Sequence, residues 1–350
     1  MMILNALKNS LKKLRYRALG LAELEEIIAD KTAVTNAALD QALGEIRQNL
    51  APIEGISSNI QLLAQPENLI PRLNDFTGRY YLSLEYPPSR NYTRRWTESN
   101  PHQGLVKLFS GEQEEYWRRC QQLVQLQPYL EKIDPVIEGR FSQEPGWLGG
   151  PINAIDSAFL YYFMTEYKPR TYLEIGSGVT TLFAARAKRD HNLTTQIISL
   201  DPEPRYGIDQ ACDQVIRQGL ETADLSLFSQ LEPGDIVFMD GSHRCFMNSD
   251  VTVFLLEVVP QLKPGVIVHF HDIVLPYDYP EMFDSWYWNE QYVLAAYLLG
   301  AQEKVQILMP TKFVSTLPEF KPFIESTLLQ NWTGPREPWL DGGSLWFTLR

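Results

Sequence analysis

Residues Tyr172-Leu-Glu-Ile-Gly-Ser-Gly-Val-Thr-Thr181 contain the pattern that decides the fold: an apolar strand runs into two glycines, and a helix opens directly after them. Gly176 and Gly178 allow a tight turn and let a ligand approach the backbone, because no Cβ stands in the way. The first amides of the helix would face that ligand. A dinucleotide-binding turn would carry glycine or alanine in place of Thr181, so the pattern is typical of a nucleotide-like ligand without specifying a dinucleotide.

The sequence around this turn alternates short apolar strands with helices. Helices are predicted over residues 155–166 and 180–189, and strands over residues 171–175, 196–200, 214–217, 235–239, 266–270, 304–309 and 344–349. Such alternation is typical of a parallel sheet with helices packed on it. We therefore predict an α/β fold with a Rossmann-like, seven-stranded, mostly parallel sheet and helices on both faces.

The first 150 residues show a different pattern. Leucines recur every three or four positions near the N-terminus, and residues 1–20 hold five basic side chains and no acidic one. Prolines then interrupt the chain up to one helix over residues 111–133, which is expected to restart near Pro128. Turn formers in residues 144–151 mark a boundary. We predict three parts: an amphipathic N-terminal helical segment over 1–50, an accessory or cap region over 51–150, and the α/β domain over 151–350.

Composition excludes several classes of protein. The 350 residues include 43 acidic and 31 basic side chains, a net charge of −12, which argues against nucleic acid as a general partner. No apolar run reaches the roughly 20 residues that a transmembrane helix needs, and the N-terminus lacks the pattern of a signal peptide. Three isolated cysteines support neither a disulfide framework nor a thiolate zinc site. We expect a cytoplasmic protein.

The basic N-terminal helix leaves three interpretations open. It can pack on its own protein or form a homo-oligomer, it can dock a partner helix, or it can lie peripherally on an anionic membrane surface.

Two acidic residues near the glycine turn strengthen the prediction of a ligand site there. Glu174 stands two residues before Gly176, and Asp201 ends the strand that follows the helix. An acid at the end of that strand can accept hydrogen bonds from both hydroxyls of a ribose. Glu174 can hold the loop or bind an ammonium group of the ligand. Alone, Asp201 would be interpreted as a helix cap before Pro202; together, the acids and the glycines indicate a cofactor site.

With these acids, the chain resembles the class I S-adenosylmethionine-dependent methyltransferases over about residues 150–350. The resemblance implies that S-adenosylmethionine is the cofactor and that the strand near the C-terminus runs antiparallel. It also implies which residues bind the cofactor: the methionine part is held by Gly176, Ser177 and Gly178, the ribose by Asp201, and the adenine side lies at Glu221.

A second group of polar residues follows two later strands, in Asp240-Gly-Ser-His243 and in His271-Asp272. Because the carboxyl ends of parallel strands meet at one edge of a sheet, we expect these side chains to converge there. The candidate catalytic residues are His243, His271 and Asp240. A histidine can remove the proton of a hydroxyl near neutral pH, with His243 the first candidate base and His271 the second. His269, deeper in its strand, is expected to be structural.

The resemblance further implies a divalent metal, since relatives that methylate hydroxyls of catechols, sugars and macrolides hold one with acids at these strand ends. Asp240 and Asp272 match those carboxylate positions, but His271 stands where another acid or an amide is expected. Mg²⁺ prefers oxygen ligands, whereas an imidazole shifts the preference toward Mn²⁺, Fe²⁺ or Zn²⁺. Metal-assisted and metal-free chemistry both stay open at this stage.

The aromatic loop over residues 276–288 follows Asp272. Aromatic faces stack on sugar rings and surround a sulfonium ion, so the loop can contact an acceptor or act as a lid; it can equally pack on its own domain.

We therefore predict an S-adenosylmethionine-dependent methyltransferase that methylates a hydroxyl of a small molecule or glycan. Two alternatives belong to other classes. The first is an NAD(P)-dependent Rossmann oxidoreductase, against which Thr181 and the lack of a Tyr-x-x-x-Lys pair after the glycines argue. The second is a non-catalytic assembly protein that keeps the fold and binds a partner through its amphipathic N-terminus.

Overall fold

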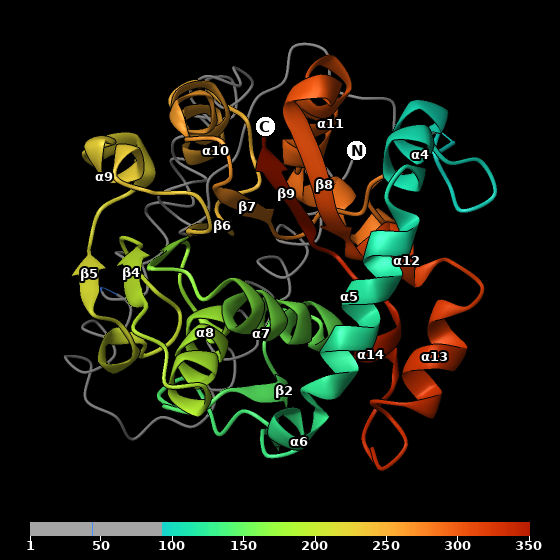
Figure 1. Ribbon diagram of the computed structural model, residues 1–350. Coiled ribbons are helices and arrows are strands. Elements are labelled where there is room, and N and C mark those ends of the chain that lie inside the picture. The colour runs from blue at the N-terminus through green and yellow to red at the C-terminus, as the bar shows by residue number, and fades with distance from the viewer. Residues whose placement is uncertain (1–43, 45–92) are drawn as a thin grey trace, which may run out of the picture. The chain divides into compact units, whose positions relative to one another are not determined.

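A seven-stranded sheet runs through the computed structural model, in the order β5-β4-β3-β6-β7-β9-β8 (Figure 1). The strands are β3 (Thr171–Ile175), β4 (Gln196–Leu200), β5 (Gln214–Ile216), β6 (Ile236–Met239), β7 (Ile267–Phe270), β8 (Val305–Pro310) and β9 (Leu345–Leu349). Neighbours from β5 to β7 are parallel, whereas β9 is antiparallel to both β7 and β8. The predicted Rossmann-like, mostly parallel sheet and its antiparallel last strand are confirmed.

The structure describes residue 44 and residues 93–350. The predicted segment 1–50, apart from Gly44, and residues 51–92 of the predicted accessory region lie outside this part. Residues 93–350 form one compact unit, so residues 93–150 of the predicted accessory region pack with the sheet. The three-part division, the cytoplasmic location, the peripheral membrane contact and the homo-oligomer stay predictions. Within the described residues, no helix has the length and apolar character needed to cross a membrane.

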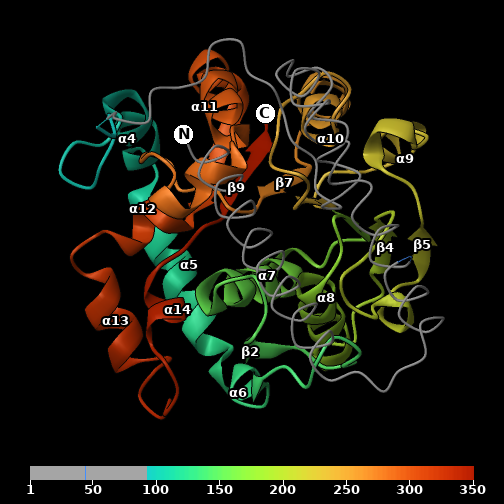
Figure 2. The same ribbon diagram turned by 180° about the vertical axis from the view of Figure 1, so that it is seen from behind.

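Helices cover both faces of the sheet: α7 and α8 lie on one face, and α10 and α11 lie on the other (Figures 1 and 2). The helices are α4 (Gln103–Ser110), α5 (Gln113–Gln125), α6 (Gln127–Leu130), α7 (Ala154–Tyr167), α8 (Val179–Asp190), α9 (Ser226–Ser229), α10 (Asp250–Val253), α11 (Glu290–Gly300), α12 (Thr311–Ser315), α13 (Phe320–Ser326) and α14 (Glu337–Leu340). The predicted helices over 155–166 and 180–189 are confirmed as α7 and α8. The predicted helix over 111–133 is interrupted at Leu126, beside Pro128, as expected.

Short elements complete the described chain. They are the parallel pair β1 (Asp134–Val136) and β2 (Gly146–Leu148), the 3₁₀ turns η1 (Asp209–Ala211), η2 (Leu220–Thr222), η4 (Val259–Gln261), η5 (Glu281–Trp286) and η6 (Gln302–Lys304), and the π turn η3 (Phe254–Val258). The sequence did not predict the β1–β2 pair, because three-residue strands are too short to show a period.

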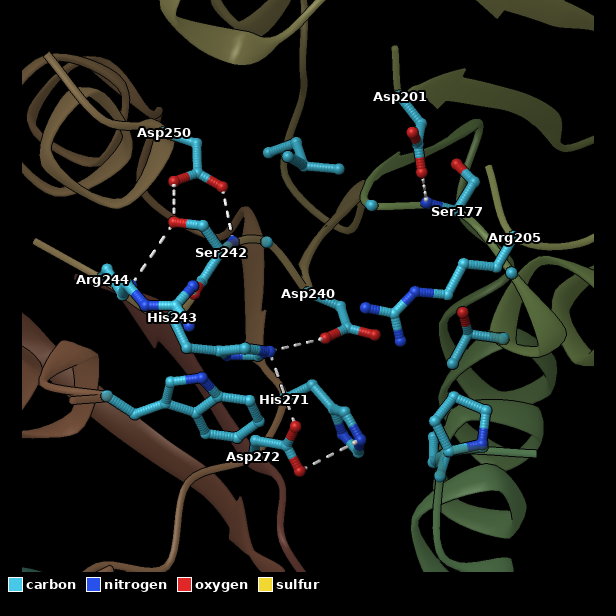
Figure 3. Close-up of a pocket in the computed structure, with 18 of the residues that line it drawn as sticks. Ser177, Asp201, Arg205, Asp240, Ser242, His243, Arg244, Asp250, His271 and Asp272 are labelled. Atoms are coloured by element: carbon cyan, nitrogen blue, oxygen red, sulfur yellow. Dashed lines mark hydrogen bonds and ion pairs between the residues drawn. The ribbon is translucent and has the colours of Figure 1, made fainter. Parts of the chain in front are cut away.

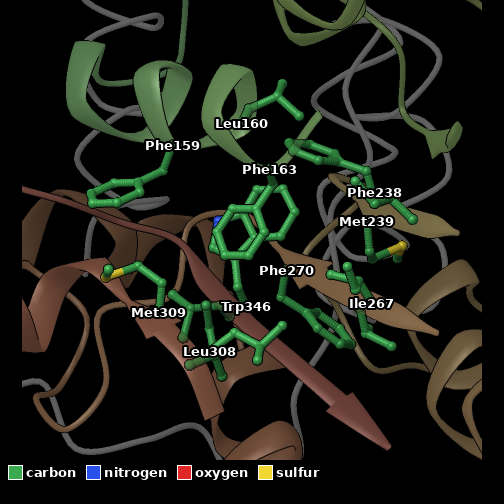
Figure 4. Packing of buried hydrophobic residues seen from close by; sticks show 14 of the residues in the cluster. Phe159, Leu160, Phe163, Phe238, Met239, Ile267, Phe270, Leu308, Met309 and Trp346 are labelled. Carbon is green, nitrogen blue, oxygen red and sulfur yellow. The ribbon is translucent and has the colours of Figure 1, made fainter. Parts of the chain in front are cut away.

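The core lies between α7 and the sheet. In Figure 4, Phe163 of α7 stacks on Trp346 of β9, with ring centroids 4.1 Å apart and an interplanar angle of 11°. Helix α7 has almost no polar face, and residues Ala154–Met164 are buried. It contacts α5, α8 and α14 as well as β2, so an apolar surface all round is what its position requires.

The turn after β3 is set by a close approach between two backbones. Gly176 has φ +79°, and a Cβ added there would lie 1.7 Å from the carbonyl oxygen of Asp240. Asp240 follows β6, the parallel neighbour of β3, and its amide donates to the carbonyl oxygen of Ile175 at 2.9 Å. A side chain at position 176 would therefore push the two strand ends apart.

Glu174 joins the end of β3 to the first turn of α8. Its two carboxylate oxygens accept hydrogen bonds from the hydroxyls of Thr180 and Thr181, and the Thr181 hydroxyl also accepts the amide of Gly178 at 3.1 Å. The carboxyl group is fully buried, and burial raises the pKa of Glu174 to about 8 although the two hydroxyls act in the opposite direction. This explains why Thr181 replaces the third glycine of a dinucleotide-binding turn: its hydroxyl holds the turn together.

The first prediction concerns the two glycines of the turn. Gly176→Ala should lower the free energy of unfolding by roughly 3 kcal/mol, because the substitution combines a positive φ with a backbone clash. Gly178→Ala is the matched control: its added Cβ would meet the nearest atom, in the Tyr206 ring, at 3.6 Å, so a loss of about 1 kcal/mol or less is expected. Urea unfolding measures both, and equal losses would contradict the role given to Gly176.

The second prediction concerns pH. Glu174 has a pKa of about 8 in the folded state against 4.5 for the free side chain, so the folded state binds its proton more tightly than the unfolded state. This contribution to stability is present at low pH and is lost as the pH rises from about 5 to about 8. Glu174→Gln should fold, and its free energy of unfolding should lack this dependence on pH. The control Glu98→Gln changes an exposed side chain and should keep the pH dependence of the unaltered protein. Urea unfolding at several pH values between about 5 and about 8 measures this dependence. If the free energy of unfolding changes with pH by the same amount in all three proteins, the raised pKa of Glu174 is rejected.

Candidate functional site

A cavity of about 1120 Å³ lies at the carboxyl ends of β3, β4, β6 and β7. Among the residues that line it are nine predicted from the sequence: Gly176, Ser177, Gly178, Asp201, Glu221, Asp240, His243, His271 and Asp272. These come from four strand ends and the η2 corner, which the fold brings to one edge of the sheet. The expected convergence of the two groups of polar residues is thus seen in the structure.

Glu174 is the predicted site residue that does not line the cavity. Side chains of a strand alternate between the two faces, and at position 174 the side chain points toward α8, where the two threonine hydroxyls occupy its oxygens. Of the two roles predicted for Glu174, its contacts fit the one that holds the loop, since it fastens the turn that borders the cavity; its part in cofactor binding stays a prediction.

Asp201 lies against the glycine turn. Its carboxylate oxygens accept the amides of Ser177 and Glu203, each at 2.7 Å, and partial burial raises its pKa although both amides lower it (Figure 3). A carboxylate oxygen can accept a second hydrogen bond, so both oxygens keep capacity for ligand hydroxyls. Glu221 also lines the cavity; it is exposed, and its carboxylate folds back over Gly219 of its own corner.

Asp240, His243 and Asp272 form a cluster that begins next to the glycine turn. The Nε2 atom of His243 lies 3.4 Å from an Asp240 oxygen and 3.5 Å from an Asp272 oxygen (Figure 3). His243 and Asp272 both have a positive φ, +59° and +52°, as each chain segment turns sharply after its strand. Ligand atoms of the three side chains lie within 4.8 Å of one another, a set that could hold a metal ion.

Glu290, which the sequence did not indicate, orients His243. Its carboxylate lies 2.9 Å from Nδ1 of His243, and Glu290 itself is 1% exposed at the start of α11. A carboxylate at Nδ1 keeps a proton on that nitrogen and directs Nε2 into the cavity. The indole of Trp288 supports the imidazole from one side, with ring centroids 4.0 Å apart. In the sequence, Glu290 resembles an ordinary acid in the first turn of a helix, which is why it was missed.

The electrostatics of the cluster favour a positive charge at His243. Burial would lower the pKa of His243, but hydrogen bonds to Asp240 and Glu290 outweigh burial and raise this pKa well above its usual value. Burial likewise acts to raise the pKa of Asp240, yet the nearby His271 and His243 bring it below its usual value. Burial raises the pKa of Asp272. The carboxylates beside His243 therefore favour the protonated form of its imidazole.

Two histidines, His269 within β7 and His271 just after it, differ in role. His271 lines the cavity, with Nε2 3.6 Å from Asp272 and Nδ1 3.4 Å from the Ser344 hydroxyl. His269 is fully buried between Phe238 and Trp346, with ring centroids at 3.7 Å and 4.3 Å, and does not line the cavity. Burial lowers the pKa of His269 well below its usual value, as expected of a structural, neutral imidazole.

Two further charged residues border the cavity without having been predicted. Asp156, at the start of α7, is buried and accepts the Thr311 hydroxyl at 2.5 Å and the Gly343 amide at 2.8 Å. It thereby fastens the loop before β9 to α7. Arg205 extends toward Asp240 in Figure 3, from the loop that follows Asp201. Both depend on contacts between distant segments, which no local pattern reveals.

Comparison with known proteins supports the family resemblance. Residues 173–273 match a family model described as a methyltransferase domain, and this segment spans the glycine turn, Asp201, Asp240, His243, His271 and Asp272. No curated protein matches the chain. Among solved structures, the SAH-bound methyltransferase PaMTH1 of Podospora anserina is 16% identical, with 56% of this chain and 78% of that chain covered and a TM-score of 0.35. An O-methyltransferase of Bacillus cereus in complex with SAH is 17% identical, with 54% and 82% covered and a TM-score of 0.33.

Both TM-scores are below 0.5, and the likeness to these two structures carries no assignment of function. The family match includes the strand, the glycine pair and the acids on which the resemblance was first drawn. Residues 173–273 are therefore similar to a methyltransferase domain, which agrees with the resemblance of the sequence to the class I, S-adenosylmethionine-dependent methyltransferases.

Proposed function

We propose that this protein transfers the methyl group of S-adenosylmethionine to an oxygen atom of a small molecule or glycan. One observation carries the proposal: the glycine turn with Asp201 and the Asp240–His243–Asp272 cluster border the same cavity. A methyl transfer needs a cofactor site and a proton-handling site side by side, since the acceptor oxygen must stand in line with the sulfonium.

The cofactor side of the cavity has the groups that the resemblance implies. Gly176, Ser177 and Gly178 bring backbone against the methionine part, and Asp201 accepts the ribose hydroxyls. Glu221 lies on the adenine side. Because the Thr181 hydroxyl holds both Glu174 and Gly178, this turn is built without the third glycine that a dinucleotide requires, which disfavours the NAD(P) alternative.

At the other side, the acceptor hydroxyl would lie beside His243 and the two aspartates. In the transfer, the bond between the methyl carbon and sulfur breaks, a bond from carbon to the acceptor oxygen forms, and the hydroxyl proton must leave. His243 is the candidate base, oriented by Glu290 at Nδ1. Its pKa is raised by its carboxylate neighbours, so Nε2 must first give up its own proton before it can accept one.

The same cluster fits a divalent cation. Two carboxylates and one imidazole are a donor set that Mn²⁺ or Zn²⁺ accepts more readily than Mg²⁺. Asp240, Asp272 and Nε2 of His243 would hold the ion, and Glu290 would orient the imidazole from behind. When bound, a metal ion lowers the pKa of a coordinated hydroxyl and so eases proton loss. We propose that the active site includes such an ion, because one ligand atom from each of the three side chains lies within 4.8 Å of the others.

The third prediction separates the two sides of the cavity. Asp201→Ala should weaken S-adenosylmethionine binding about tenfold or more, because a charge-assisted hydrogen-bonding partner of the ribose is lost. His243→Ala should leave that affinity unchanged and lower turnover about a hundredfold or more. Calorimetry with the cofactor and S-adenosylhomocysteine release with a panel of hydroxylated acceptors measure the two effects. The reverse pattern would reject the assigned roles, and no cofactor binding by the unaltered protein would reject the function.

The fourth prediction concerns the metal. Treatment with EDTA should lower the methylation rate about tenfold or more, and Mn²⁺ should restore it better than Mg²⁺ because an imidazole belongs to the donor set. Asp272→Asn should weaken the restoration by Mn²⁺. If EDTA leaves the activity unchanged, the proposed metal ion is rejected. His243 would then act as a general base without a metal.

A further inference from the structure

The segment over residues 280–288 forms one edge of the cavity and is rich in apolar side chains. Pro280, Met282, Phe283, Trp286 and Trp288 all line the cavity. Met282 and Trp286 are nevertheless 64% and 42% exposed. Large apolar side chains exposed beside a polar site are unfavourable in water unless a ligand covers them. We call this segment the acceptor wall.

The aromatic rings of the acceptor wall contact one another. Phe283 stacks on Trp288, with centroids 4.4 Å apart and an interplanar angle of 20°. Trp286 packs against both rings, at 5.2 Å and 5.1 Å. The buried Tyr279 meets Phe283 edge-on at 5.5 Å. Phe283 and Trp288 therefore cover part of each other's ring surface. Trp286 lines the cavity and keeps part of its ring exposed.

A strap over residues 94–102 fastens the acceptor wall from outside. Arg94 donates to the carbonyl oxygen of Tyr279 at 2.7 Å and forms an ion pair with Asp284, also at 2.7 Å. Trp96 and Asp278 are joined twice, since the Asp278 amide donates to the Trp96 carbonyl at 2.9 Å and the Trp96 amide donates to the Asp278 carboxylate at 3.0 Å.

The other end of the acceptor wall is bound to the catalytic cluster. The Asn289 amide donates to the carbonyl oxygen of His243 at 3.0 Å, and the Asn289 side chain accepts the Cys245 amide at 2.6 Å. Arg244 donates to the carbonyl oxygen of Trp286 at 2.9 Å. The position of the wall and the position of His243 are therefore linked through backbone contacts.

We propose that the acceptor wall binds the apolar face of a hydroxyl-bearing ring, with Trp286 as the contact residue and Arg94 as a positioning residue. A ring stacked on Trp286 has its hydroxyl edge within the cavity that His243 and Asp272 border. The apolar face can belong to an aromatic ring or to the C–H face of a sugar, because both stack on indole. The identity of this ligand class rests on the proposed function, but the binding itself can be measured without any methyl transfer.

The test measures binding of three probes to the full-length protein by saturation-transfer NMR: catechol as an aromatic ring, methyl β-glucoside as a sugar ring, and glycerol as a polyol without a ring face. At least one ring probe should bind, and glycerol should bind more weakly. Trp286→Ala should weaken the ring probe about fivefold, the size of effect expected for one lost stacking partner. Whichever ring binds better identifies the source of the apolar face.

Arg94 is tested against its neighbour. Arg94→Ala should weaken ring binding about threefold and raise the acceptor KM more than it changes kcat, while Arg94→Lys, which keeps a cation opposite Asp284, should restore part of the affinity. Arg95→Ala is the matched control, since Arg95 is exposed and should leave ring binding unchanged. Equal binding of glycerol and the rings, no ring binding, or identical affinities of the Trp286→Ala and unaltered proteins would overturn the proposed site. Equal effects at Arg94 and Arg95 would overturn the role of the strap.

Calorimetry with S-adenosylmethionine on the same proteins keeps this inference separate from the proposed function. Ring binding without cofactor binding would reject the methyltransferase activity and retain the acceptor wall. Cofactor binding and turnover that Trp286→Ala leaves unchanged would reject the wall and retain the activity.

Discussion

The rest of the site depends on the close approach of Gly176 to the carbonyl oxygen of Asp240, where the ends of β3 and β6 meet. These two strands are paired in parallel, so the segments that follow them leave the sheet side by side. The space between them admits a backbone but no Cβ. This contact places the cofactor turn next to the first acid of the catalytic cluster, and the distance between the two halves of the site follows from it.

The site contains several buried or partly buried charges, and their mutual arrangement makes them tolerable. The carboxylates of Glu290 and Asp240 stabilise the protonated imidazole of His243. In return, the charge of that imidazole lowers the free-energy cost of burying these two carboxylates. An isolated charge in this environment would shift its pKa until it became neutral. Because the compensation is mutual, removal of one of these side chains changes the protonation of the others.

Glu174 shows how the pleat of a strand selects between two roles that a motif leaves open. The sequence places it two positions before Gly176, in a pattern that suggests contact with the ligand. In the structure, the alternation of side chains along β3 directs Glu174 to α8, where Thr180 and Thr181 take up both oxygens. The linear pattern specifies that an acid is present, while the pleat of the strand decides which face it serves.

The sequence by itself determined the order of strands and helices, the glycine turn and the convergence of Asp240, His243, His271 and Asp272. These follow from local rules, since apolar periods define the elements and parallel strands present their carboxyl ends at one edge. Only the tertiary structure decided that Glu290 orients His243, that Asp156 fastens the loop before β9, and that Arg94 holds the acceptor wall. Those contacts join segments separated by 47, 187 and 190 residues, and a pairing at such distances is set by the packing of the whole sheet rather than by any local pattern.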